Sequence, residues 1–189
     1  MKGASEVYIE DSTFESSTAG YTPTGDNGKG GAICMDAITK PITIKNTMFH
    51  QNRGRGGGAI ALLSNSNFQL TIKQSTFSGN TAGGGTPNVG TGELRGGAIY
   101  GKNTNLEIVI EDTVFVGNSA LEGGGSIRMD RGKLSLKAST FTGNKDKSSK
   151  GSAIYMKHSV SELIFIGPDN QFLNDNDNPD KMIYLQDSA

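Results

Sequence analysis

The chain has 189 residues, of which 27 are glycine and one is cysteine, and its formal net charge is −1. One domain is the default at this length, and the nearly balanced charge gives no reason to expect nucleic acid as a partner. The lone Cys34 excludes an intramolecular disulfide framework. No run of about 18 apolar residues is present to form a transmembrane helix, and the start at Met1-Lys2-Gly3 lacks the apolar segment of a signal peptide.

The strongest signal along the chain is an internal repeat, which decides the fold before any single motif does. In each copy an aliphatic residue lies five positions before a phenylalanine, and an asparagine or serine follows that phenylalanine by three positions. The five regular copies place these residues at Ile9, Phe14 and Ser17; Ile44, Phe49 and Asn52; Ile72, Phe77 and Asn80; Ile110, Phe115 and Asn118; and Leu136, Phe141 and Asn144. A sixth, degenerate copy runs from Leu163 to Phe172 with one residue extra.

A second phrase, Gly-Gly-Ala-Ile or a close variant, alternates with the first. Its copies begin at Gly30, Gly57, Gly96, Gly124 and Gly151, and Met182-Ile183-Tyr184-Leu185 matches the strand half of a sixth. We expect the paired glycines to supply a positive φ or a close backbone approach at a sharp corner. Below, this phrase is called the GGAI phrase.

Apolar and polar residues alternate inside every copy, as Ile42 and Ile44 do around Thr43. A period of two predicts short strands with one buried face, and no segment shows an apolar stripe of helical period. Each repeat then contains three strands: one after the paired glycines, one with alternating aliphatic residues and one around the phenylalanine. Stacked in register, the repeats predict an all-β fold, a single-stranded parallel β-helix of about six rungs with three parallel sheets.

Equivalent residues of successive rungs form columns in such a coil. We expect the five regular phenylalanines, Phe14, Phe49, Phe77, Phe115 and Phe141, to stack inside the cylinder. The asparagines Asn52, Asn80, Asn118 and Asn144 are expected to form a ladder of mutually bonded amides, because an unpaired buried amide costs about 1–3 kcal/mol. An outward column of Glu10, Lys45, Lys73, Glu111 and Lys137 is expected to form weak surface ion pairs.

The alternation of Phe-x-x-Asn with the GGAI phrase resembles the repeats of the chlamydial polymorphic outer-membrane proteins, over about residues 7–185. The resemblance implies a right-handed β-helix that forms the passenger of an autotransporter, a location outside the cell or on its surface, and a role in adhesion. It implies a host or neighbouring cell-surface protein or glycan as the partner. Because the sequence begins and ends inside a repeat, we expect residues 1–189 to be one segment of a longer solenoid, whose ends meet further rungs or copies of itself.

Repeat length varies at one place, between the asparagine and the paired glycines. The intervening stretches are 18–29, 53–56, 81–95, 119–123 and 145–150. The long loops therefore emerge along one edge, which repeat proteins often use for binding; the alternative is ordinary tolerance of surface loops to insertion. Arg53, Arg55 and Arg95 lie in these stretches and are candidate binding residues.

The middle residue of each GGAI strand forms another column, which we expect to face outward. It consists of Cys34, Ala61, Tyr100, Arg128, Tyr155 and Tyr184. Aromatic residues with an arginine are the composition of a protein-binding hot spot, so Tyr100, Arg128, Tyr155 and Tyr184 are candidate contacts. The alternative is cation–π stacking along the strand direction.

Residue types for catalysis or metal binding do not converge. Asp36 and Asp130 share a column, but two rungs separate them by roughly 14 Å, which is too far for paired acid–base work. The acidic stretch 174–180 lacks the central glycine and closing glutamate of a calcium loop. His50 and His158 have no partners at ligand spacing. We therefore expect no enzyme, no metal and no cofactor.

Together these patterns predict an extracellular or surface-displayed β-helix that acts as an adhesin or structural stalk and presents loops along one edge. Two alternatives stay open: a fragment of a carbohydrate-active β-helix of the pectate-lyase or tailspike kind, and a purely structural filament or appendage module.

Overall fold

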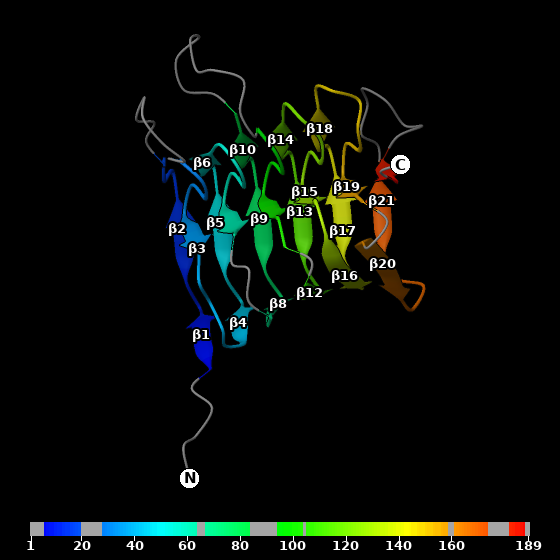
Figure 1. The fold of residues 1–189 in the computed structure, drawn as a ribbon. Coiled ribbons are helices and arrows are strands. Elements are labelled where there is room, and N and C mark those ends of the chain that lie inside the picture. The colour runs from blue at the N-terminus through cyan, green and yellow to red at the C-terminus, as the bar shows by residue number, and fades with distance from the viewer. Residues whose placement is uncertain are drawn as a thin grey trace.

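A computed structural model describes residues 6–19, 28–63, 67–83, 94–103, 105–158, 161–173 and 182–187. In these residues the chain winds into a coil of short parallel strands, and each rung of the coil pairs with the next (Figure 1). The rungs lie side by side from the blue N-terminal end to the red C-terminal end.

Four parallel sheets make up the described coil, and each runs in chain order. The aliphatic sheet contains β1 (Val7–Glu10), β4 (Ile42–Lys45), β8 (Phe68–Lys73), β12 (Leu106–Glu111), β16 (Gly132–Lys137) and β20 (Ser161–Ile166). The phenylalanine sheet contains β2 (Thr13–Glu15), β5 (Met48–His50), β9 (Thr76–Ser78), β13 (Val114–Val116), β17 (Thr140–Thr142) and β21 (Gln171–Leu173). The GGAI sheet contains β3 (Ile33–Met35), β7 (Ile60–Leu62), β11 (Ile99–Gly101), β15 (Ile127–Met129), β19 (Ile154–Lys157) and β22 (Ile183–Gln186). The short sheet contains β6 (Arg53–Gly54), β10 (Thr81–Ala82), β14 (Ser119–Ala120) and β18 (Lys145–Asp146).

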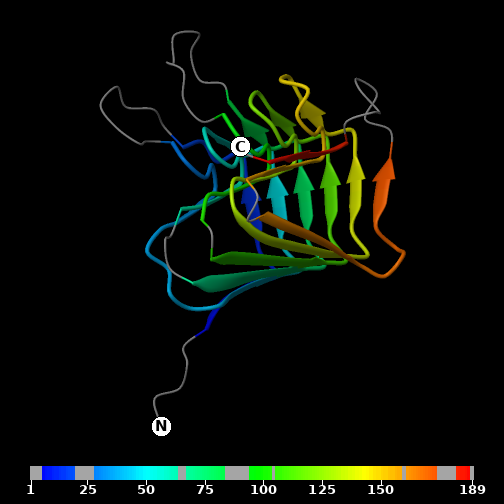
Figure 2. The ribbon, with the colours of Figure 1, turned by 45° about the vertical axis from the view of Figure 1, so that its right-hand side comes forward.

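The predicted parallel β-helix of six rungs is confirmed. In Figure 2, with the C-terminal end turned toward the viewer, the last rung runs from β20 along the bottom, up through β21, and back along β22. The chain thus turns counterclockwise as it advances toward the viewer, which makes the coil right-handed. The expectation of three sheets missed the short sheet, because its two-residue strands are too brief for an alternating pattern to be visible in the sequence.

The core is a set of columns along the coil axis. Six phenylalanine rings stack face to face, with centroids 4.6–4.9 Å apart and planes within 8° of parallel. Phe172 of the degenerate copy continues the five regular rings. Alternate residues of the aliphatic sheet complete the buried cluster, together with the first and third residues of the GGAI strands, which point inward as the period of two predicts.

The sixth copy departs from the predicted spacing. Phe165 pairs with Leu136 and Phe172 pairs with Phe141. The interval in the sixth copy is therefore seven residues where the regular interval is five, so the expectation of one extra residue was wrong by one. The added residues fall in the bend after β20, where Gly167 adopts a φ of 73°.

The paired glycines have two separate roles. The first, as at Gly57 and Gly96, adopts a φ of 71° or 63°, the left-handed region that glycine enters without strain. The second leaves no room for a side chain: a Cβ on Gly58 would lie 2.0 Å from the carbonyl oxygen of Gly97 in the next rung. Both halves of the expectation for this corner are confirmed.

The asparagine ladder is present and buried. Asn80 accepts the backbone N–H and the side-chain amide N–H of Asn52, each at 3.0 Å, and donates in turn to Asn118 Oδ1 at 3.0 Å. Its Nδ2 also donates to the carbonyl oxygen of Phe49 at 2.9 Å. The same pattern continues from Asn118 to Asn144. The amides of Asn80 and Asn118 thus bond to the rungs on both sides of them, so these buried polar groups have hydrogen-bond partners.

A second ladder, of hydroxyl groups, was not predicted. Each of Thr47, Ser75 and Thr113 donates its hydroxyl to the carbonyl oxygen two residues earlier, at 2.7–2.8 Å. The oxygens of Ser75 and Thr113 also accept backbone N–H groups of the preceding rung, from Thr47 at 3.2 Å and from Ser75 at 3.4 Å. The serine or threonine of the repeat therefore closes the bend between the aliphatic and phenylalanine sheets. On the surface beside it, the expected ion pairs form between Lys45 and Glu10 at 2.6 Å and between Lys73 and Glu111 at 3.0 Å.

Candidate binding pocket at the insertion corner

The insertion corner is the bend between the short sheet and the GGAI sheet. Residues 20–27 and 84–93, which contain most of the two long predicted loops, lie outside the described residues, as does the acidic stretch 174–180. Their flanking residues are described and rejoin the coil at this corner: Thr18 bridges to Arg53, and Gly56 bridges to Arg95. The sequence prediction that length varies along one edge therefore matches the topology.

The middle column of the GGAI strands points away from the core cluster but is not exposed. Tyr100, Arg128 and Tyr155 have exposed fractions of 0%, 4% and 2%. The expectation of an open aromatic surface is therefore wrong for these three residues, and within this column only Cys34 is exposed. The reason is that backbone turns of the insertion corner fold over the outer face of the sheet.

Two glycines allow this cover to lie flat on the rings. A Cβ on Gly56 would lie 2.8 Å from Cδ1 of Tyr100, and a Cβ on Gly123 would lie 2.2 Å from Cδ1 of Tyr155. Any side chain at either position would push the turn off the ring beneath it. Each of these glycines directly precedes a pair of glycines in the GGAI phrase. Its role is to let the turn cover the tyrosine ring, not to form the sharp bend of the backbone.

Beneath the turns, Asp130 accepts hydrogen bonds from two arginines and from a tyrosine. Its Oδ1 accepts Arg128 Nε at 2.7 Å, and its Oδ2 accepts the Tyr100 hydroxyl at 2.8 Å and Arg95 Nη1 at 3.0 Å. Burial pushes the pKa of this carboxyl upward, but the nearby Arg128, the Tyr100 hydrogen bond and Arg95 together hold it below the ordinary value. Asp130 is therefore ionised and fixes both guanidinium groups.

Arg128 also carries the cation–π contact that the sequence left as an alternative. Its guanidinium carbon lies 4.5 Å from the centroid of the Tyr155 ring, and Arg95 lies 5.9 Å from that of Tyr100. Arg128 also donates to the carbonyl oxygen of Glu122, and the Tyr155 hydroxyl donates to Gln186 Oε1. The column is thus a preorganised polar layer.

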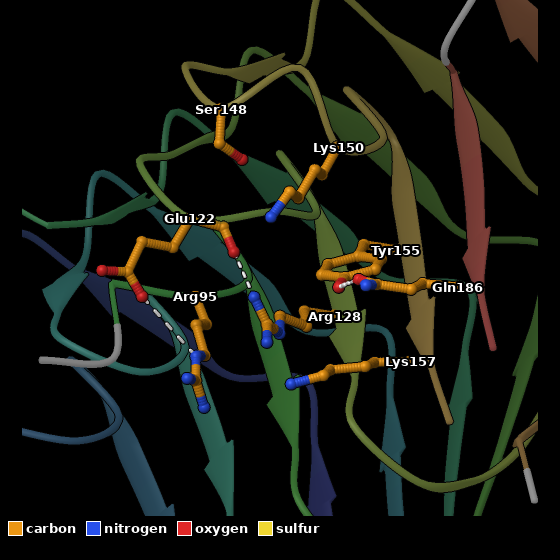
Figure 3. A pocket seen from close by; sticks show the side chains of 8 residues that line it. All are labelled: Arg95, Glu122, Arg128, Ser148, Lys150, Tyr155, Lys157 and Gln186. Atoms are coloured by element: carbon orange, nitrogen blue, oxygen red, sulfur yellow. Dashed lines mark hydrogen bonds and ion pairs between the residues drawn. The ribbon is translucent and has the colours of Figure 1, made fainter. Parts of the chain in front are cut away.

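A hollow of about 260 Å³ opens over this layer (Figure 3). It is lined by Arg95, Glu122, Arg128, Ser148, Lys150, Tyr155, Lys157 and Gln186. In the view of Figure 3, Lys150 reaches down from the turn after β18, and Lys157 lies on the opposite side of Arg128 at the end of β19. Four cationic side chains therefore surround one small space.

The carboxylates near the hollow are already engaged. Glu122 Oε2 lies 3.6 Å from Arg95 Nε. Asp146 accepts the backbone N–H groups of Gly123 at 2.8 Å and Lys150 at 2.5 Å, together with the hydroxyl of Ser148. Among the described residues, the ammonium groups of Lys150 and Lys157 make no hydrogen bond or ion pair. The hollow thus holds two uncompensated positive charges.

The predicted binding residues divide into two groups. Arg95, Arg128 and Tyr155 line the hollow, with Tyr100 directly beneath. Tyr184 packs edge-on against Tyr155, with centroids 5.4 Å apart, and does not line it. Arg53, which is exposed in β6, and the half-buried Arg55 lie elsewhere on the corner.

Four charged contributors were missed by the sequence reasoning: Glu122, Asp130, Lys150 and Lys157. A signal for two of them was available, because Asp130 and Lys157 stand two residues after Arg128 and Tyr155 and so share their face of the sheet. Lys150 and Glu122 sit in turns, where no periodicity places a side chain.

Within the described ranges, no group of three or more His, Cys, Asp and Glu side chains is arranged to hold a metal ion. The described residues also form no helix long and apolar enough to cross a membrane. Comparisons of the chain with protein-family models, with curated proteins and with solved structures found no match.

Proposed function

We propose that the protein is a surface-displayed β-helix that binds a partner through its insertion corner, as an adhesin or as a stalk that carries such a surface. The observation that carries the proposal is the concentration of length variation, uncompensated charge and a hollow at one corner of an otherwise regular coil. The partner would be a protein or glycan of a host or neighbouring cell, met outside the cell that makes the chain.

The regular part of the coil supports this role as a scaffold. Its stacked rings, amide ladder and hydroxyl ladder bind each rung to its neighbours over the length of the described chain. Such cross-rung bonding gives a stiff rod whose local openings are rare. A rigid element that carries variable loops is the usual arrangement of a binding protein. The motif resemblance to autotransporter passengers points in the same direction.

We expect excision of the insertions to leave the coil intact. Excision of residues 84–93 joins Gly83 to Leu94, and a Cβ on Gly83 would already lie 3.3 Å from Cβ of Leu94. The shortened turn then has the same length as residues 121–123 in the next rung. Excision of residues 20–27 likewise leaves a turn as long as residues 55–56.

The test measures binding of the fluorescently labelled chain to cultured epithelial cells and to immobilised glycans. The two excision variants are compared with the intact chain and with Lys137→Gln, which changes an exposed residue on the aliphatic sheet. We expect at least one excision to reduce binding while the thermal unfolding midpoint and the circular dichroism spectrum stay unchanged. Equal binding by both excision variants and the intact chain, or no binding to any surface, would refute the proposal.

A further inference from the structure

We infer that the hollow over Arg128 binds an acidic saccharide, through a carboxylate or sulfate group that sits between Lys150 and Lys157. The inference deepens the proposed function, because it rests on the insertion corner being a binding edge and names the chemistry of its ligand.

The charge distribution calls for an anion. Arg95 and Arg128 are compensated by Asp130 beneath them, and Glu122 adds a second acidic partner for Arg95. The carboxylate of Asp146 faces the turn and is held by two backbone N–H groups and the Ser148 hydroxyl. Of the four cationic side chains that line the hollow, Lys150 and Lys157 have no counterion among the described residues. Charge-assisted hydrogen bonds from two ammonium groups are the strong interactions that oxyanions make with proteins.

The Arg128 side chain and the backbone that carries the two lysines are held in place before any ligand arrives. The Arg128 side chain lies flat on Tyr155 at 4.5 Å and is fixed by Asp130 Oδ1 at 2.7 Å. Lys157 belongs to β19, where it pairs in register with Gln186 of β22. The backbone N–H of Lys150 is pinned by Asp146. Arg128 therefore loses little side-chain freedom on binding, which favours affinity, whereas the two lysine side chains become ordered together with the ligand.

The lining suits a hydroxyl-bearing ligand rather than an apolar one. Tyr155 is the sole aromatic side chain in the lining, and Arg128 already covers its ring. Oε1 of Glu122 and the hydroxyl oxygen of Ser148 offer acceptors for hydroxyl groups, while the side-chain amide of Gln186 offers N–H donors. A volume of about 260 Å³ lies below the usual range for drug-sized ligands. The hollow therefore fits about one charged sugar unit, with the rest of an oligosaccharide running out over the corner.

The experiment is isothermal titration calorimetry with four probes: trigalacturonate, a sulfated heparin tetrasaccharide, neutral maltotriose and sodium sulfate. We expect one or both acidic oligosaccharides to bind, with an affinity that falls as salt concentration rises, and maltotriose to fail. Trigalacturonate carries carboxylates alone, whereas the heparin tetrasaccharide carries both carboxylates and sulfates. Binding of trigalacturonate therefore assigns the group as carboxylate, and binding of the heparin tetrasaccharide without trigalacturonate assigns it as sulfate. Sodium sulfate binding as tightly as the oligosaccharides would reduce the site to a simple anion site and overturn the saccharide inference.

Variants separate local chemistry from net charge. The double substitution Lys150→Gln with Lys157→Gln should weaken binding by about a hundredfold, because loss of each charge-assisted hydrogen bond costs about tenfold in affinity. The matched control, Lys137→Gln with Lys147→Gln, removes the same charge from two exposed residues that do not line the hollow. Equal weakening by both pairs, or no binding of either acidic oligosaccharide, would overturn the inference. If excision of residues 84–93 abolishes cell binding while no acidic oligosaccharide binds, this inference fails and the proposed function stands.

Discussion

Replacement of Phe77 by alanine tests the stacked core most directly. The ring has no exposed surface and lies between Phe49, 4.6 Å away, and Phe115, 4.9 Å away. Loss of a fully buried phenylalanine forfeits about 3 kcal/mol of transfer free energy, and each lost ring contact adds about 0.5–1.5 kcal/mol. We therefore expect the free energy of unfolding to fall by about 4–5 kcal/mol, near the top of the roughly 3–5 kcal/mol range for this substitution.

The matched comparison is Phe172→Ala at the C-terminal rung. Phe172 is half-buried and stacks on Phe141 at 4.9 Å, so its removal should cost only about 1–2 kcal/mol. Urea denaturation followed by far-UV circular dichroism measures both variants, provided that the dependence on urea concentration is unchanged. Equal costs for the two positions, or a neutral Phe77 variant, would refute the assignment of these rings to one continuous interior column.

Two further predictions concern buried polar groups. Asn118→Ala should cost about 2–3 kcal/mol in the same urea assay, because Asn80 loses its acceptor for two donors; the exposed Asn105→Ala should be nearly neutral, and similar costs for both would contradict the ladder. Burial raises the pKa of Asp130, but Arg128 and its other partners bring it below the ordinary 3.8, so its carboxylate contributes stability at neutral pH that is lost as pH falls through the lower folded-state pKa. Asp130→Asn should therefore unfold at a lower temperature than the original protein at neutral pH, and the gap should shrink below about pH 4. A gap in the thermal midpoint that does not change with pH would contradict this account.

The fold could be predicted because its information is repeated. One copy of Phe-x-x-Asn says little, but five copies at a fixed offset place Phe14 to Phe141 in one column, and all adjacent pairs were found in register. The short sheet was not predicted, because each of its strands has only two residues and shows no alternating pattern. The hydroxyl ladder escaped for a different reason: Thr47 and Ser75 occupy a bend, where the bonding partner is the backbone of another rung.

The site was predicted only in part, and the errors have a physical origin. Alternation placed Tyr100, Arg128 and Tyr155 on the outer face correctly, but it could not reveal that turns would cover that face. The cover depends on Gly56 and Gly123, whose missing side chains are meaningful only when the rings beneath them are seen. In the regular strands the sequence period predicts which face a side chain occupies. In the variable turns no period exists, so the contacts of a side chain are known only from the structure.

The apposition of Gly83 and Leu94 has a consequence for how such a chain can change. Because these two residues are already neighbours, a foreign peptide or a small folded unit spliced between them would begin and finish at points that are close together. Closing the loop that such a graft forms adds little entropic cost to the folding of the rod, and that cost grows only slowly with the length of the graft. The position between Gly83 and Leu94 is therefore an insertion site, at which segments of different chemistry would be exchangeable while the rungs keep the hydrogen bonds and ring contacts between them.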